Sequence, residues 1–151
     1  MCISISICSA FVDLMNLQII SKYSYMKKYR ITLTKEQLML IANCVEDCHR
    51  FACGQTELWH TTSAFNIKEW DELRDRLQCM QPLVTPELDR GASYGWAGNG
   101  CKDKFQRKFI AQTYAIYREI LHKVVNNGVY ASPTLRCEEG GELPIIEEVE
   151  E

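Results

Sequence analysis

The sequence predicts a small α+β domain that is mainly helical. Three segments, at about 35–53, 67–80 and 103–126, carry apolar residues at helical spacing. Two or three shorter segments, at about 28–34, 129–136 and 143–149, have the length or alternation of strands. The chain has 151 residues, of which 46% are apolar, and this fits one compact core and not two large ones.

The first predicted strand and helix adjoin at Thr34. Residues 28–34 read KYRITLT, in which Tyr29, Ile31 and Leu33 alternate with polar residues. Thr34 and Gln37 match the capping box that satisfies the unpaired amides at a helix start. We expect this helix to bury its apolar face and to expose its polar face. The two faces consist of Leu38, Ile41, Val45, Cys48 and Ala52 and of Asn43, Glu46, Asp47 and Arg50, respectively.

The second helix is predicted over 67–80, with Asn66 as its N-cap. Before it, QTELWH reads as a continuation of the first helix after a kink at Gly54, and HTTSAFN as a polar turn. Pro82 and Pro86 end regular structure. The buried stripe of this helix is expected to comprise Ile67, Trp70, Leu73, Leu77 and Met80.

The third helix, 103–126, has an apolar surface that is too wide for one neighbouring element to cover. Asn126, Asn127 and Gly128 supply a left-handed stop. Since apolar surface remains for a second copy of the chain, we expect a homo-oligomer.

Three parts of the chain differ in composition. Residues 1–25 read as an extension, non-native or disordered, before a natural start at Met26, or else as a genuine extra strand or helix. Residues 26–137 form the single globular domain. Residues 138–151 form an acidic tail with seven glutamates and no basic residue. Residues 1–137 hold 17 Lys and Arg against 13 Asp and Glu, so the body carries a charge of about +4.

The eight cysteines do not indicate a secreted protein. Residues 1–25 lack the basic start of a secretory signal, and Asp13, Asn16 and Gln18 interrupt the apolar run. We therefore expect free thiols, a cytoplasmic location and no membrane span.

Residues 90–109, RGASYGWAGNGCKDKFQRKF, carry most of the functional information. The lysine does not follow the last glycine directly, and Asp103 stands where a phosphate-binding P-loop needs a hydroxyl, so we do not expect a nucleotide hydrolase of that class. Glycines, a helix start and cations are nevertheless suited to an anion. The expected ligand-binding residues are Arg90, Tyr94, Trp96, Asn99, Lys102, Lys104, Arg107 and Lys108. The alternatives are a mobile surface loop, and an Asp103 that caps the helix itself.

No catalytic or metal site is predicted. Cys44 and Cys48 share a helical face, but a structural zinc site normally has a C-x-x-C knuckle, and buried core cysteines are the ordinary explanation. A thiol paired with His49, His60 or His122 lacks any sign of activation. We expect no enzyme activity and no cofactor. Nucleic acid is also disfavoured, because the acidic tail would repel it.

Two stretches, ITLTKEQLMLIANCVEDCHRFACGQTEL (31–58) and YASPTLRCEE (130–139), resemble small uncharacterised proteins of phages and prophages of gut Bacteroides-like bacteria. That resemblance implies the cytoplasm of an infected cell, where small phage proteins inhibit or titrate host components. No activity is assigned to the group, so it transfers no functional residue.

Together these features predict a non-enzymatic protein that sequesters a phosphorylated or cyclic nucleotide, as a phage antagonist of host nucleotide immune signalling. The alternative is a protein-binding module that docks onto a host protein and inhibits it.

Overall fold

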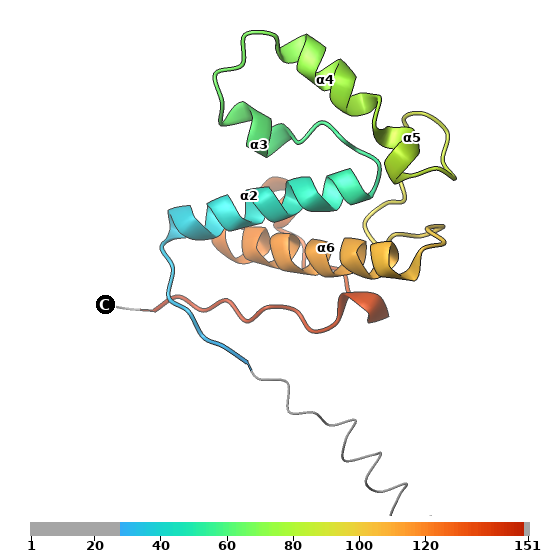
Figure 1. Cartoon of the computed structure of the whole chain (residues 1–151). Coiled ribbons are helices and arrows are strands. Elements are labelled where there is room, and N and C mark those ends of the chain that lie inside the picture. Colours follow the sequence, from blue (N-terminus) through green and yellow to red (C-terminus); the bar gives the residue numbers. More distant parts are fainter. Residues whose placement is uncertain (1–27, 150–151) are drawn as a thin grey trace, which may run out of the picture. The chain divides into compact units, whose positions relative to one another are not determined.

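The computed structural model describes residues 28–149 of the chain (Figure 1). The chain divides into two units, residues 1–32 and 33–151, and the elements below belong to the second. The prediction for residues 1–25 lies outside the described residues. The helices are α2 (Lys35–Ala52), α3 (Trp59–Ser63), α4 (Trp70–Gln78), α5 (Gln81–Val84) and α6 (Lys104–Val124), with short 3-10 turns η1 (Gly128–Tyr130) and η2 (Glu138–Gly140).

The prediction of an α+β fold was wrong, since residues 28–149 contain helices and no strand. Residues 28–34 alternate as a strand would, but they form no strand, and Tyr29 and Ile31 are exposed. Residues 143–149 likewise form no strand. An alternating pattern makes a strand only where a second strand takes its backbone hydrogen bonds.

The third predicted strand, 129–136, is instead held by a side chain. Arg118 donates hydrogen bonds to the backbone oxygens of Val129, Tyr130 and Ser132, over 2.6–3.4 Å. These carbonyls therefore bind a guanidinium of α6 in place of a neighbouring strand.

Helix α2 begins as predicted, and Leu38, Val45 and Ala52 of the predicted apolar face pack in the core, but its buried surface also extends onto the predicted polar face. Thr34 and Gln37 form the complete capping box. Glu46 and Asp47, predicted to be solvated, are buried, whereas Ile41 and Cys48 are exposed. The reason is that α2 lies between α6 and α3, and the short α3 occupies a stretch predicted as a polar turn.

The predicted helix 67–80 is shorter than expected. Helix α4 begins at Trp70 with Glu69, not Asn66, at its N-cap, and it ends at Gln78. No residue of its apolar stripe is fully buried, and Met80 is 41% exposed. A separate turn of helix, α5, follows with Pro82 in its first turn, where proline is tolerated.

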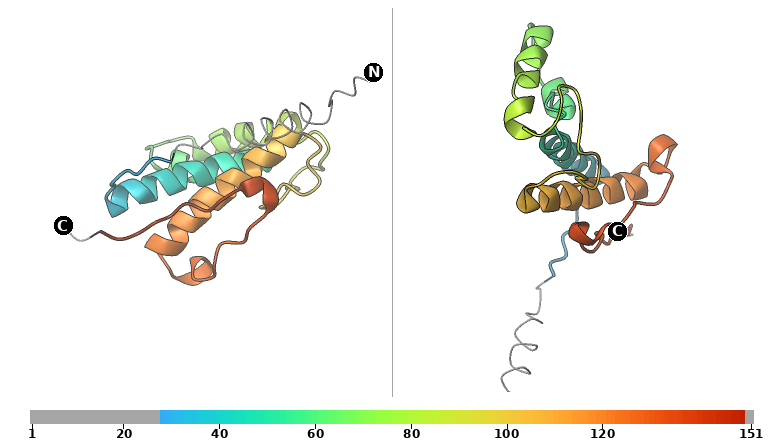
Figure 2. Two further views of the ribbon diagram at one scale, coloured as in Figure 1. Left: turned by 90° about the horizontal axis from the view of Figure 1, so that it is seen from below. Right: turned by 90° about the vertical axis from the view of Figure 1, so that its right-hand side faces the viewer.

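Helices α2 and α6 lie side by side and run antiparallel (Figure 2). Asp103 caps α6 by accepting hydrogen bonds from the Phe105 and Gln106 amides at 2.8 and 2.9 Å. Asn126 has a left-handed φ of 45° just after the helix, which confirms the predicted stop. One core cluster comprises Ala42, Tyr114, Tyr117, Ile120 and Leu121, and a second comprises Ala52, Cys53, Tyr94, Cys101 and Ile110.

The C-terminal segment packs back on α6. Gly140 lies against the Ala111 backbone oxygen, where a Cβ would come within 3.1 Å, and Ile146 packs against the first core cluster. Glu139 forms an ion pair with Arg107. None of the helices within residues 28–149 is both long enough and apolar enough to cross a membrane.

Candidate functional site

The aromatic residues of the predicted loop site pack into the domain. Tyr94 is only 3% exposed, its amide donates to the Cys53 carbonyl at 3.1 Å, and its phenol donates to the Glu87 carboxylate. Trp96 is half-buried against Tyr114, with 4.9 Å between ring centroids. Both rings hold the loop against α2 and α6, so in this conformation Tyr94 presents no open face on which a base could stack.

The polar residues of the loop and of early α6 point to several different partners. Arg107 donates to the Cys101 carbonyl at 3.2 Å, and its Nε lies 3.4 Å from Glu139 Oε1. Lys104 Nζ lies 5.1 Å from the Phe105 ring centroid. The side chains of Asn99, Lys102 and Lys108 are exposed.

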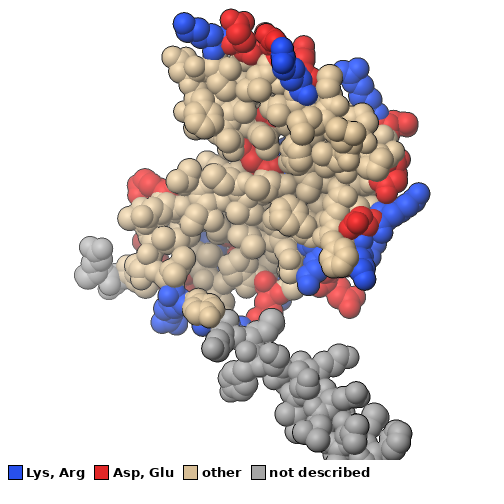
Figure 3. All heavy atoms as spheres, in the orientation of Figure 1, with Lys and Arg blue, Asp and Glu red and all other residues tan. Residues whose placement is uncertain are grey.

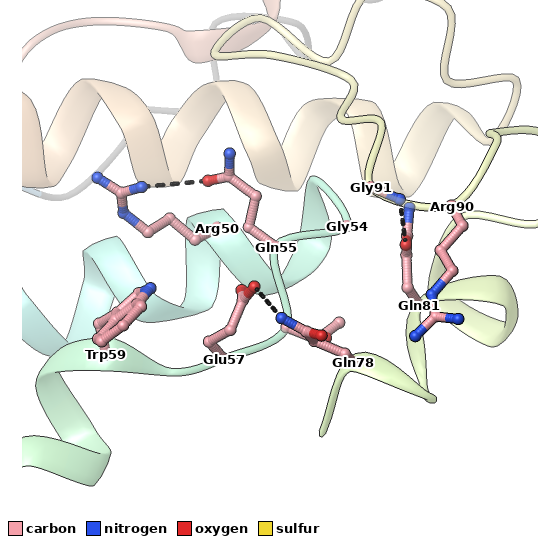
Figure 4. Close-up of a pocket in the computed structure, with 10 residues that line it drawn as sticks. Arg50, Gly54, Gln55, Glu57, Trp59, Gln78, Gln81, Arg90 and Gly91 are labelled. Atoms are coloured by element: carbon pink, nitrogen blue, oxygen red, sulfur yellow. Dashed lines mark hydrogen bonds between the residues drawn. The ribbon is translucent and has the colours of Figure 1, made fainter. Parts of the chain in front are cut away.

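Of the eight predicted binding residues, Arg90 lines a cavity and the other seven do not. The cavity has a volume of about 300 Å³ and opens between the end of α2, the segment that follows it, and residues from α4, α5 and the start of the glycine-rich loop (Figure 4). The lining residues are Arg50, Gly54, Gln55, Thr56, Glu57, Trp59, Gln78, Gln81, Arg90 and Gly91. Its volume stands at the small end of the range typical of ligand pockets.

Part of the cavity wall is rigid because its polar groups are already satisfied. The Gln81 amide donates to the carbonyls of Asp89 and Ala92 and accepts from the Gly91 amide, over 2.8–3.1 Å. Thr56 donates to the Leu77 carbonyl at 2.7 Å. These contacts join the segment after α2 to the end of α4, and α5 to the start of the glycine-rich loop. The bond to the Gly91 amide also places its neighbour Arg90 at the cavity.

Arg50 is held in place by a carboxylate behind the cavity. Glu46 is 2% exposed, and its Oε1 lies 2.6 Å from Arg50 Nη2 and 2.8 Å from Arg50 Nε. Arg50 Nη1 also donates to Gln55 Oε1 at 3.1 Å. The Arg50 charge is thus largely compensated, and this guanidinium orients the Gln55 amide, whose NH₂ group remains free to donate.

Arg90 carries the uncompensated positive charge of the cavity. Its side chain has no hydrogen-bond or ion-pair partner within residues 28–149, and it is exposed at the rim. Glu57, the acid of the lining, accepts from Gln78 Nε2 at 3.1 Å and leaves the Gln78 carbonyl oxygen free. Trp59 is 49% exposed, and its other neighbour is Trp70, with 5.7 Å between centroids. A guanidinium, an indole and two amides with spare hydrogen-bonding capacity therefore surround one hollow.

A buried polar cluster fixes α3 and Trp59 beside this cavity. Asp47 is 1% exposed and accepts from the amides of His60 and Thr61, at 3.1 and 2.5 Å, at the start of α3. Glu46 Oε2 lies 3.2 Å from His60 Nε2. Sequence reasoning missed this cluster, because a carboxylate that caps a helix 13 residues away leaves no local pattern. The i,i+4 spacing of Glu46 and Arg50 was the one sequence feature that could have predicted part of this cluster, their ion pair.

The Cys53–His49 pair has no features of an activated nucleophile. Cys53 Sγ lies 3.7 Å from His49 Nε2 and donates a hydrogen bond to the Gly95 carbonyl oxygen at 3.2 Å. Burial raises the pKa of Cys53 to about 12 and lowers the pKa of His49. Both groups are therefore neutral near pH 7, so the thiolate needed for attack is not formed.

Within residues 28–149, no three side chains of His, Cys, Asp or Glu come together as metal ligands would. Cys44 and Cys48, the pair considered for zinc, are both exposed thiols.

Comparison with known proteins adds no assignment: no family model, curated protein or solved structure matches the chain. The resemblance to phage proteins stays a prediction.

Proposed function

We propose that the protein binds a small ligand with a flat ring and an anionic group, of the nucleotide class, in the cavity between Arg50 and Arg90. The observation that carries this proposal is the free Arg90 guanidinium at the rim of a hollow that also exposes the Trp59 ring. An indole stacks on bases, and a guanidinium binds phosphate through paired hydrogen bonds.

Each available group has a distinct role in this proposal. Arg90 binds the phosphate, and Trp59 packs against the base. The free Gln55 NH₂ and the Gln78 carbonyl oxygen form hydrogen bonds with the base or sugar, while Arg50 keeps Gln55 in position. Glu57 disfavours a phosphate deep in the cavity, so we place the anion at the Arg90 end. The cavity volume of about 300 Å³ favours a ligand of one nucleotide's size.

We propose binding without chemical conversion, since the cavity lining pairs no nucleophile with a base: the hydroxyl of Thr56 is buried and donates to the Leu77 carbonyl, and the carboxylate of Glu57 accepts from Gln78. Sequestration of a host nucleotide signal by a phage protein is the biological role that follows if the resemblance to phage proteins holds. In that role the protein would lower the free concentration of the signal and release it unchanged.

The test is thermal unfolding of the full chain with a panel of mononucleotides, cyclic mononucleotides and cyclic dinucleotides. A ligand that binds only the folded state raises the Tm. Arg90→Gln removes a charge-assisted hydrogen bond worth about 1.5–3 kcal/mol and should weaken binding at least tenfold. Trp59→Leu should also weaken it.

Lys108→Gln is the matched control, because it removes an exposed cation of the predicted loop site that lies outside the cavity. This variant should bind as the wild type does, and chromatography should recover the nucleotide intact. If no nucleotide shifts the Tm, or if Lys108→Gln abolishes the shift while Arg90→Gln retains it, the proposed site is wrong.

A further inference from the structure

One surface of the domain is apolar, uncharged and covered by no described element. On α2, Ile41, Cys44 and Cys48 follow at i, i+3 and i+7, and each is exposed. On α6, the exposed residues Phe105, Phe109, Gln112 and Ile116 follow at i, i+4, i+7 and i+11. Such spacing places each set along one side of its helix. We call these seven residues the neutral face.

The two rows of the neutral face adjoin across the α2–α6 contact. Thr113 lies between Phe109 and Ile116 on the helix surface, and its hydroxyl is 3.4 Å from His49 Nδ1 on α2. His49 is the neighbour of Cys48 in sequence. The other sides of these helices are occupied, α2 by α3 and α6 by η1 and η2. In Figure 3 the spheres over α2 and α6 are largely tan, and the blue and red ones gather mainly at the edges.

We infer that the neutral face binds the same face of a second copy of this chain, as a two-fold symmetric dimer. A symmetric interface pairs each side chain with an identical surface, so a charged patch would repel its own copy. None of the seven residues is charged. Two cations of α6, Lys104 and Lys108, lie at the rim: Lys104 Nζ is 5.1 Å from the Phe105 ring centroid, and Lys108 is one turn from Phe105 and Gln112. The neutral face is therefore self-complementary in charge. A surface that binds a charged partner would instead carry residues of the opposite charge.

The apolar area is sufficient for a weak dimer. Phe105 and Phe109 are 73% and 46% exposed, and Ile41 and Ile116 are 37% and 38% exposed. Since a phenylalanine side chain buries about 200 Å² and an isoleucine about half of that, these four contribute roughly 300 Å² per copy. With the two cysteines and Gln112, two copies would bury on the order of 1,000 Å², close to the lower limit of specific interfaces. We expect a dimer that dissociates on dilution.

The first test is sedimentation velocity of the full chain across a hundredfold range of concentration. The wild type should shift from monomer mass towards twice that mass as concentration rises. Phe109→Glu, which places a charge at the centre of the neutral face, should remain monomeric throughout. Leu83→Glu is the matched control: Leu83 is 82% exposed on α5, outside the face, and this variant should dimerise normally.

A second measurement needs no destabilising variant. The rate of thiol alkylation, followed by peptide mass spectrometry, should fall with increasing protein concentration at Cys44 and Cys48, because both become covered. It should stay constant at Cys79, an exposed thiol that follows α4. A wild type that stays monomeric at every concentration, a Phe109→Glu variant that still dimerises, or alkylation rates that change equally at all three cysteines would overturn the inference.

Discussion

Buried polar residues, each with a defined partner, position the candidate site. Glu46 and Asp47 lie inside the domain because Arg50 pairs with the Glu46 carboxylate and the first amides of α3 donate to the Asp47 carboxylate. A buried charge that loses its partner costs several kcal/mol, whereas the intact pair adds little stability of its own. These contacts therefore position the side chain of Arg50 and the helix that carries Trp59 at the cavity.

His49 gives a pH prediction at the same scale. Its Nδ1 lies 3.0 Å from the Ile110 carbonyl oxygen, and burial lowers its pKa below the ordinary 6.5. The unfolded chain therefore takes up a proton that the folded domain excludes. As the pH falls through 6.5, the free energy of unfolding should decrease, and above about pH 7.5 this contribution should be constant.

Urea unfolding at pH 7.5 and 5.5 measures this effect. His49→Gln should cost about 1 kcal/mol at pH 7.5, where it loses a buried hydrogen bond. It should then lose less stability than the wild type on going to pH 5.5. Equal losses in the two proteins would show that His49 is not the group responsible.

At the scale of elements, local side-chain caps set the starts of the two long helices, α2 and α6. The capping box of Thr34 and Gln37 and the cap at Asp103 were both legible in the sequence, and both are present. Asp103 also bears on function, because its carboxylate occupies the two amides that a phosphate would need at the start of α6.

Asp103→Ala should lower the free energy of unfolding by about 1 kcal/mol, since the Phe105 and Gln106 amides lose their acceptor. Asp103→Asn keeps a side-chain oxygen and should cost clearly less. Chemical denaturation of the wild type and the two variants measures these differences in the free energy of unfolding. Equal stability of the wild type and the alanine variant would mean that this cap contributes nothing.

What the sequence could not predict depended on distant contacts. Helix α3 has five residues and a left-handed N-cap residue, Leu58, with a φ of 52°, and its first amides are satisfied by Asp47. No pattern within HTTSAFN contains that information. The expected strands failed for a related reason: alternation is local, but strand pairing requires a second segment, and Arg118 already binds the carbonyls of residues 129–132.

At the scale of the whole molecule, the glycine-rich loop and the cavity also show that residues adjacent in sequence need not form one site in the fold. The loop predicted a site because its glycines, rings and cations are adjacent in sequence. In the fold, Tyr94 and Trp96 face the core, and the cavity is built from residues 50–59, 78–81 and 90–91. Arg90 belongs to both groups because it starts the loop at the cavity rim.

The most direct measurement of the proposed function is a nucleotide titration followed by the indole N–H signals in ¹H–¹⁵N NMR spectra. Trp59 lines the cavity, and Trp96 lies in the glycine-rich loop against Tyr114, so the two rings report on the two sites separately. Because the chain has three tryptophans, Trp59→Phe and Trp70→Phe variants are needed to assign the three signals. We predict that the Trp59 signal shifts to saturation while the Trp96 signal stays in place. A shift at Trp96 without one at Trp59, or no shift at either ring, would contradict it.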